Sequence, residues 1–193
     1  MFQGGYLGKV LRVNLTTKTA VVEALPEKIA RDYIGGAGFG VKYLFDEVPG
    51  NTDPLGPDNK LIFAPGPLSG TPAPCASRMA VTTKSPLTGA VGMSLSGGYF
   101  PVELKFAGYD VLIIEGQADT PVYLHIKDDK VTIKNAEKLW GMDTQITQNI
   151  IKQDVGDHNT RIACIGPAGE KRSKMAAIIN ERRAFGRKGV GAV

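Results

Sequence analysis

The fold can be worked out from one stretch of the sequence, RMAVTTKSPLTG at residues 78–89, which is followed by SLSGGYF at residues 94–100. The pattern predicts a short apolar strand at residues 78–83. In and around this strand lie one arginine, one lysine, six Ser or Thr hydroxyls and three glycines. Arginine offers a planar fork of donors to phosphate or carboxylate, hydroxyls add neutral donors, and glycine lets backbone N–H groups approach a ligand. The stretch therefore predicts an anion-binding site.

A second segment with the same chemistry is RRAFGRKGVG at residues 182–191. Residues 171–193 carry seven Lys or Arg against one Glu, a net charge of +6, whereas residues 1–170, with 16 basic and 18 acidic side chains, carry −2. The basic character is local, which favours a binding site over a generally cationic surface. Two such segments predict one large ligand with several negative charges.

Composition restricts the class of protein. With 193 residues, of which 42% are hydrophobic, the chain is long enough for a real core, and we expect one compact unit. Cys75 and Cys164 show neither CxxC nor Cys/His spacing, which excludes a self-contained zinc or iron–sulfur site in this chain and argues against a secreted disulfide framework. No apolar run reaches membrane-spanning length, and no signal-peptide pattern is present. We therefore expect a cytoplasmic protein without a membrane partner.

Two successions of elements follow the same order. The first is a hairpin at residues 7–13 and 19–24, a helix opened by Pro26 and closed or interrupted by the glycines of residues 35–38, a second short helix at 40–45, and a buried strand at 60–64 that runs into Gly66-Pro67. The second is a hairpin at 122–127 and 130–134, a helix capped by Asp143 and ending at Gly156, and a strand at 161–165 that runs into Gly166-Pro167. Each then leads to a cationic segment.

This order predicts an α+β fold that is internally duplicated. The two hairpin-helix-strand halves, about 1–100 and 116–193, would contribute mixed β-sheets and face each other across a cofactor groove by a pseudo-twofold. Residues 111–114, VLII, form a near-continuous apolar strand that is expected in the centre of a sheet. The alternative is a chance resemblance between two α+β halves. In either case the expected organisation is a single domain over residues 1–193.

Several long motifs, in order along essentially the whole chain, carry a resemblance to a known family. They are GPLSG at 66–70, TKSPLTG at 83–89, SGGYF at 96–100, ELKFAGYD at 103–110, IGPAGE at 165–170 and GRKGVGAV at 186–193. The chain resembles the N-terminal domain of the tungsten-containing aldehyde:ferredoxin oxidoreductases. The resemblance implies that this domain is the base for a bis-pterin cofactor of tungsten, or of molybdenum in some relatives, whose two phosphates are bridged by magnesium.

The resemblance also implies site residues. The cofactor-binding positions are Arg78, Leu95, Ser96, Gly97, Gly98, Arg183, Ala184, Gly186 and Arg187. Magnesium would be bound by the backbone carbonyls of Leu95 and Ala184. Leu95 stands where the family has Asn, so the carbonyl role can survive but a side-chain contact cannot. Lys188 also departs from the family's Gly-Arg-Gly-Gly pattern and adds a charge.

For the intact family enzyme the resemblance implies oxidation of an aldehyde with water to a carboxylic acid. Two electrons would pass through the metal to a 4Fe-4S cluster and then to ferredoxin. The cluster cysteines, the acid/base residues and the substrate channel would lie in later domains that this chain lacks. We therefore assign no catalytic residue here, expect the isolated chain to be inactive, and regard a homodimer as one oligomeric state that the resemblance allows.

The principal alternative is a non-catalytic module that binds anions or nucleic acid through the basic, glycine-rich C-terminal segment. This segment contains one aromatic residue, Phe185, and so offers little stacking surface for single strands. We therefore expect no nucleic-acid partner. Residues 35–40, GGAGFG, have the wrong spacing for a dinucleotide fingerprint.

Individual residues also have simpler interpretations. Arg78 could form a structural salt bridge, Arg183 and Arg187 could belong to a solvated basic helix end, and Gly97-Gly98 could be only a turn. Both cysteines are interpreted as unreactive thiols. The two histidines, His125 in a hairpin and His158 in a polar turn, are given no role.

Overall fold

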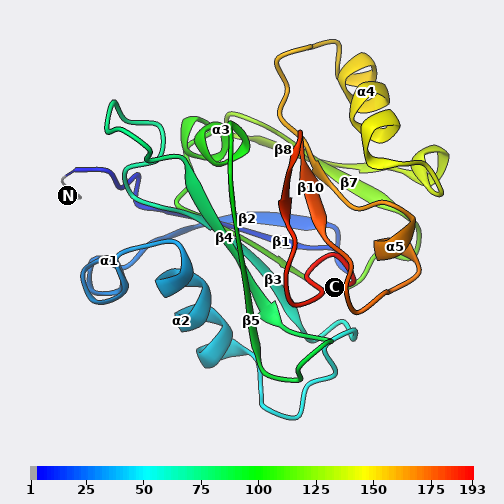
Figure 1. Ribbon diagram of the computed structural model, residues 1–193. Helices are drawn as coiled ribbons and strands as arrows, with labels where there is room; N and C mark the ends of the chain where they lie inside the picture. The colour runs from blue at the N-terminus through cyan, green and yellow to red at the C-terminus, as the bar shows by residue number, and fades with distance from the viewer. Residues whose placement is uncertain (1–3) are drawn as a thin grey trace.

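A computed structural model describes residues 4–193 (Figure 1). Its largest element is a six-stranded sheet of order β2-β1-β6-β3-β4-β5. The strands are β1 (Lys9–Asn14), β2 (Thr19–Ala24), β3 (Lys60–Pro65), β4 (Arg78–Lys84), β5 (Val91–Gly97) and β6 (Val111–Glu115). β1 and β6 are parallel and the other neighbours are antiparallel, so the predicted α+β class with mixed sheets is confirmed.

The predicted central strand is confirmed. β6 lies between β1 and β3, and Val111 and Ile113 have no exposed surface. Because successive side chains of a strand point to opposite faces, Val111 and Ile113 pack in one core while Leu112 packs in the other. A strand buried on both faces is read in the sequence as a continuous apolar run.

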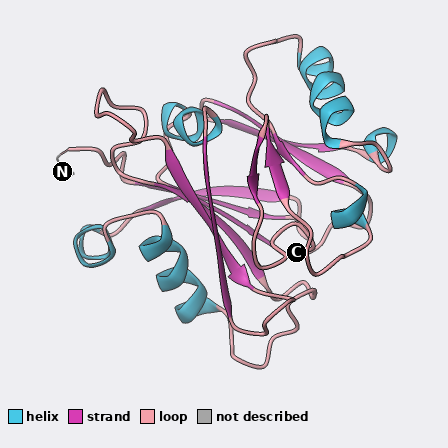
Figure 2. Ribbon diagram, in the orientation of Figure 1, coloured by secondary structure: helices cyan, strands magenta, loops and turns pink. Residues whose placement is uncertain are grey.

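Two helices, α1 (Glu27–Tyr33) and α2 (Ala37–Glu47), cover one face of the large sheet (Figure 2). The predicted interruption by the glycines of residues 35–38 is confirmed, since α1 ends at Tyr33 and Gly36 caps the start of α2. The second helix is longer than the predicted residues 40–45, and both Gly38 and Gly40 lie inside it. A Cβ atom at Gly40 would lie 2.1 Å from Oγ1 of Thr82 on β4, and one at Gly38 would lie 2.0 Å from the Tyr33 carbonyl oxygen. These glycines are required for close packing of α2, and tertiary contact outweighs their low helix propensity.

The other face carries the second half of the chain. It contains α3 (Phe100–Phe106), the hairpin β7 (Val122–Lys127) and β8 (Lys130–Asn135), a 3-10 turn at Glu137–Leu139, α4 (Thr144–Val155), β9 (Ala163–Cys164), α5 (Pro167–Glu170), β10 (Ile178–Asn180) and β11 (Arg183–Phe185). The predicted second hairpin is confirmed. So is the helix capped by Asp143, whose side chain accepts from two backbone N–H groups, and ended by Gly156 at φ +73°.

The strand expected at residues 161–165 is shorter than predicted. Only β9 is extended and paired, since it meets β10 through two residue pairs, Ile179 with Cys164 and Asn180 with Ala163. The internal duplication stays a prediction. The first hairpin belongs to the six-stranded sheet, whereas the second forms a two-stranded sheet of its own. The single-domain organisation likewise stays a prediction.

A group of ion pairs on the α2 side of the sheet gives stability a pH dependence. Arg12 contacts Glu23 at 2.8 Å, Glu47 at 2.9 Å and Glu115 at 3.2 Å, and Lys60 pairs with Glu47 and Glu115. Burial would raise the pKa of Glu47 and of Glu115, but hydrogen bonds from Arg12 to Glu47 and from Lys60 to Glu115 outweigh it and hold both pKa values below 4.5. Their stabilising contribution is therefore present above the unfolded-state pKa and is lost as the pH falls through the folded-state values.

We accordingly expect the free energy of unfolding to be flat near neutral pH and to fall below about pH 4.5. The double substitution Glu47→Gln/Glu115→Gln should lower stability at pH 7 and make the acid decline shallower. Urea denaturation at several pH values measures both effects. An acid decline that is identical in the variant and the wild type would contradict the assignment.

Candidate functional site

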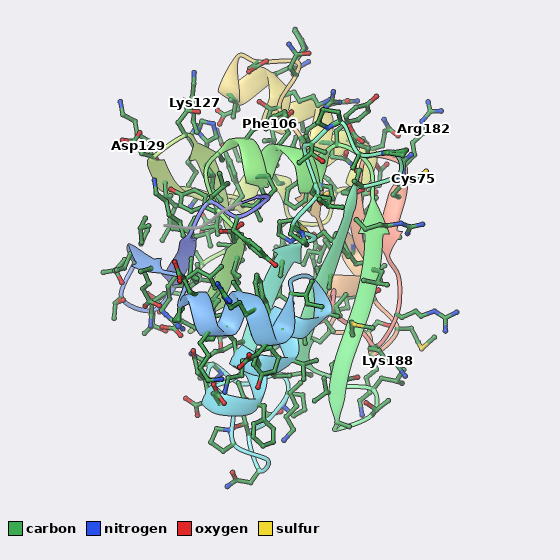
Figure 3. The ribbon with its side chains drawn as sticks, turned by 90° about the vertical axis from the view of Figure 1, so that its left-hand side faces the viewer. Cys75, Phe106, Lys127, Asp129, Arg182 and Lys188 are labelled. Carbon is green, nitrogen blue, oxygen red and sulfur yellow. The ribbon has the colours of Figure 1, made fainter. Side chains whose placement is uncertain are left out.

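The C-terminal segment lies against β5, the edge strand of the large sheet. In Figure 1, β10 and β11 run beside β5 although about ninety residues separate them in the sequence. Figure 3 shows Cys75, Arg182 and Lys188 along this same side of the molecule. Two cavities open where β5 and β11 meet.

The structure brings all nine predicted site residues to these cavities. The first cavity has a volume of about 640 Å³ and is lined by seven of them, Arg78, Leu95, Ser96, Gly97, Gly98, Arg183 and Ala184. The second has a volume of about 430 Å³ and is lined by Leu95, Ala184, Gly186 and Arg187. Leu95 and Ala184 line both cavities. The two residues predicted to supply magnesium ligands therefore lie at the boundary between the two spaces.

The side chains of β5 explain how the two segments are held together. Ser94 and Ser96 are buried, whereas Met93 and Leu95 are exposed, which reverses the usual polar-out pattern of an edge strand. Ser94 Oγ accepts a hydrogen bond of 3.1 Å from the backbone N–H of Arg187, and Ser96 Oγ accepts one of 3.3 Å from Nδ2 of Asn180. These hydroxyls, which the sequence suggested as ligand donors, join the C-terminal segment to the large sheet.

Three arginines at the cavities have no partner within the described residues. Among residues 4–193, the side chains of Arg78, Arg183 and Arg187 form no ion pair or hydrogen bond, and all three are exposed. The alternative of a structural salt bridge at Arg78 is therefore not observed in this part of the chain. A cation that the fold leaves unpaired keeps all its donors for a ligand.

Glycine is required where the arginines approach the backbone. Gly98 has φ +97°, and a Cβ atom there would lie 3.2 Å from Cδ of Arg183. A Cβ atom at Gly97 would lie 3.0 Å from the carbonyl oxygen of Ser77, whose hydroxyl donates to the carbonyl of Gly98. The glycine pair thus forms a turn and also leaves room at the floor of the first cavity.

Sequence reasoning missed several residues that line the first cavity, among them Cys75, Ser77, Tyr99 and Val102. Tyr99 directly follows the glycine pair, and Cys75 lies three residues before Arg78, so proximity to predicted site residues was the available signal.

Cys164 is half-buried, and burial raises the pKa of its thiol to about 12, which keeps it protonated at neutral pH.

Other features of the described chain lie apart from these cavities. His125 and His158 line neither of them. Across residues 4–193, no three His, Cys, Asp or Glu side chains come together as a metal-binding group. None of the helices in that range has the length and apolar character that a membrane span requires.

The structure thus defines an α+β protein with two adjoining, arginine-lined cavities at the edge of its large sheet. The chain belongs to the aldehyde ferredoxin oxidoreductase family, since residues 10–193 match the model of the "Aldehyde ferredoxin oxidoreductase, N-terminal domain". Members of the family that are about 50% identical to it include oxidoreductases named for tungsten, and this chain corresponds to their N-terminal part.

Two relatives illustrate the relationship. The chain is 53% identical over 190 residues to the tungsten-containing aldehyde ferredoxin oxidoreductase of Pyrococcus abyssi, covering 98% of this chain and 31% of the relative. It is 33% identical over 204 residues to the aliphatic sulfonate oxidoreductase, WOR-like subunit, of Pyrococcus furiosus, covering 97% and 32%. The chain therefore spans about a third of the length of these curated relatives.

A solved structure has the same fold. The active site complex BamBC of benzoyl coenzyme A reductase, in complex with 1,5-dienoyl-CoA, superposes with a TM-score of 0.97 at 40% sequence identity. The superposition covers 99% of this chain and 29% of that one.

Proposed function

We propose that this chain is the cofactor-binding N-terminal domain of a tungsten aldehyde ferredoxin oxidoreductase and that its two cavities receive the two halves of a bis-pterin cofactor. One observation carries the proposal: nine separately predicted residues line two neighbouring cavities that share Leu95 and Ala184. A ligand with two similar anionic halves suits this arrangement. The names of the relatives favour tungsten over molybdenum.

The residues present fit such a group. Arg78 and Arg183, with the glycine pair Gly97 and Gly98, would bind one phosphate in the first cavity, and Arg187 the other in the second. Arginine forms charge-assisted, bidentate hydrogen bonds with phosphate that are about twice as strong as neutral ones. The chemistry of the shared boundary also fits, because backbone carbonyls such as those of Leu95 and Ala184 are suitable ligands for magnesium that keeps several waters.

When bound, the cofactor would supply two-electron oxidation of an aldehyde to a carboxylic acid. The contribution of this chain is to bind the anionic groups, to orient the cofactor and to set the electrostatic field around it. The 4Fe-4S cluster, the substrate channel and the contact with ferredoxin belong, in this proposal, to the part of the enzyme outside these residues. A cytoplasmic location is part of the same proposal.

For the rival function, nucleic-acid binding, the basic segment has no aromatic side chain available to stack on bases. Phe185, the single aromatic residue of the basic segment, has no exposed surface and packs edge-on against Phe63 with ring centroids 6.0 Å apart. A buried ring cannot stack on bases. The cavities support a compact anionic ligand better than a polynucleotide.

The test is the cofactor content of the full-length parent protein, purified without oxygen. We expect tungsten together with two pterins for each metal atom, and aldehyde-dependent reduction of ferredoxin. A folded full-length protein that contains neither metal nor pterin would contradict the proposal. Micromolar binding of RNA at physiological salt, weakening steeply as salt increases, would favour the rival.

A further inference from the structure

We propose that Arg161 is a positioning residue of the first cavity, which keeps Arg183 free for an anionic ligand by holding the carboxylate of Glu181. The proposal rests on the anion-binding role proposed above and adds to it a residue that lines neither cavity. Its basis is a set of charged contacts between the segment before β9, the turn before β11 and the start of α3.

Arg161 contacts one residue that lines the first cavity, Tyr99, and one residue that does not, Glu181. Its Nη1 lies 2.6 Å from Oε1 of Glu181, and its Cζ lies 4.5 Å from the centroid of the Tyr99 ring. Tyr99 lines the first cavity and precedes α3. The ion pair is partly buried, so its electrostatic attraction is less screened than at the surface, whereas the Tyr99 ring is exposed. Arg161 thereby orients a tyrosine and a carboxylate at once.

Glu181 and Arg183 lie beside the same glycine. From the position that a Cβ atom would occupy at Gly98, Oε2 of Glu181 is 3.4 Å away and Nη1 of Arg183 is 3.3 Å away. Yet no ion pair joins Glu181 to Arg183, and the one ion pair of Glu181 within residues 4–193 is with Arg161. Arg161 therefore pairs with a carboxylate that lies beside a ligand-facing arginine.

The backbone of Glu181 is held in place, so only its side chain is free to move. Glu181 has φ +52°, and its N–H donates to Oε1 of Gln148 on α4 at 3.1 Å. If Arg161 were removed, the carboxylate of Glu181 would lose its ion-pair partner while lying beside the same glycine as Arg183. Opposite charges attract more strongly in a partly desolvated site than in bulk water. Glu181 would then pair with Arg183 and compete with the anionic ligand.

A double-mutant experiment tests this competition. Inorganic phosphate is titrated into the full-length protein, prepared without cofactor, by isothermal calorimetry. We expect Arg161→Ala to weaken phosphate binding about tenfold, and Arg161→Ala/Glu181→Gln to restore it to within about twofold of the wild type. Glu181→Gln alone should bind phosphate at least as tightly as the wild type. Arg161→Lys, which keeps the charge, should lose less affinity than Arg161→Ala.

The controls separate this inference from the proposed function. Arg31→Ala removes an exposed positive charge on α1, lines neither cavity, and should leave phosphate binding unchanged. If Arg183→Ala weakens binding but the double variant is no better than Arg161→Ala, Arg161 has only a structural role and this inference alone is overturned. If the wild type binds no more phosphate than Arg183→Ala, both proposals are overturned. Thermal unfolding of each variant shows that the binding losses are not losses of fold.

Discussion

Replacing Arg78 and Arg187 together with alanine is expected to remove tungsten and pterin from the full-length protein. Each arginine lines a different cavity, and neither is paired with a carboxylate within the described residues. A hydrogen bond to a charged group contributes about 1.5–3 kcal/mol, so the loss of two amounts to about 3–6 kcal/mol, or a hundred- to ten-thousand-fold in affinity. Metal analysis and pterin fluorescence after anaerobic purification measure the result.

A matched control also removes two positive charges, both of them outside the cavities. Arg172 and Arg182 are exposed and line neither cavity, so Arg172→Ala/Arg182→Ala should retain the wild-type metal and pterin content. Equal loss in the two double variants would show that only the net charge of the protein matters and not the position of the arginines. Full cofactor content after Arg78→Ala/Arg187→Ala would remove both arginines from the site.

The largest effect on stability is expected from Asp110→Ala. Asp110 is 2% exposed, and its Oδ1 accepts from Nζ of the buried Lys105 at 2.5 Å. Its Oδ2 accepts from the backbone N–H groups of Leu7 at 2.9 Å and Gly8 at 2.7 Å. Removing one partner of a buried ion pair leaves an uncompensated charge, which costs about 3–5 kcal/mol. Urea denaturation followed by circular dichroism measures the change in the free energy of unfolding.

An exposed ion pair provides the comparison. Lys28 and Asp32 pair across one turn of α1 at the surface, where solvent screens the interaction, so Asp32→Ala should change stability little. A loss for Asp110→Ala no larger than that for Asp32→Ala would contradict the structural role of the buried pair. Because Lys105 also donates to the carbonyl of Gly5 and lies on α3, the pair joins the segment before β1 to the wall of the first cavity.

The sequence predicted correctly those elements that depend on residues close together in the chain. Asp143 and Gly156 mark the ends of α4 because a cap acts within a few residues, and the second hairpin follows from alternation around a polar turn. The glycines of α2 show where such reasoning fails. Gly40 packs against Thr82 of β4, which lies 42 positions away in the sequence. Helix propensity contains no information about such a distant contact.

The cavities show the same contrast between local sequence signals, which were predictable, and long-range contacts, which were not. The nine residues could be named from motifs and from the donors that an anion needs, but β5 was not predicted as a strand, and Tyr99 was not assigned to the site. The burial of the Ser94 and Ser96 side chains could not be predicted without knowing where the C-terminal segment lies. Arg161, which lies before β9, carries no motif at all.

The sequence by itself determined most of the helices and strands, the family and the cationic chemistry of two segments, because each depends on residue types at short spacing. Only the tertiary structure decided that these segments meet. The hydrogen bonds that join β5 to Asn180 and Arg187 span 84 and 93 residues, and the contact of Arg161 with Tyr99 spans 62. Such contacts arise when packing brings distant segments together, so the shared boundary at Leu95 and Ala184 and the unpaired state of Arg183 became visible only in the folded chain.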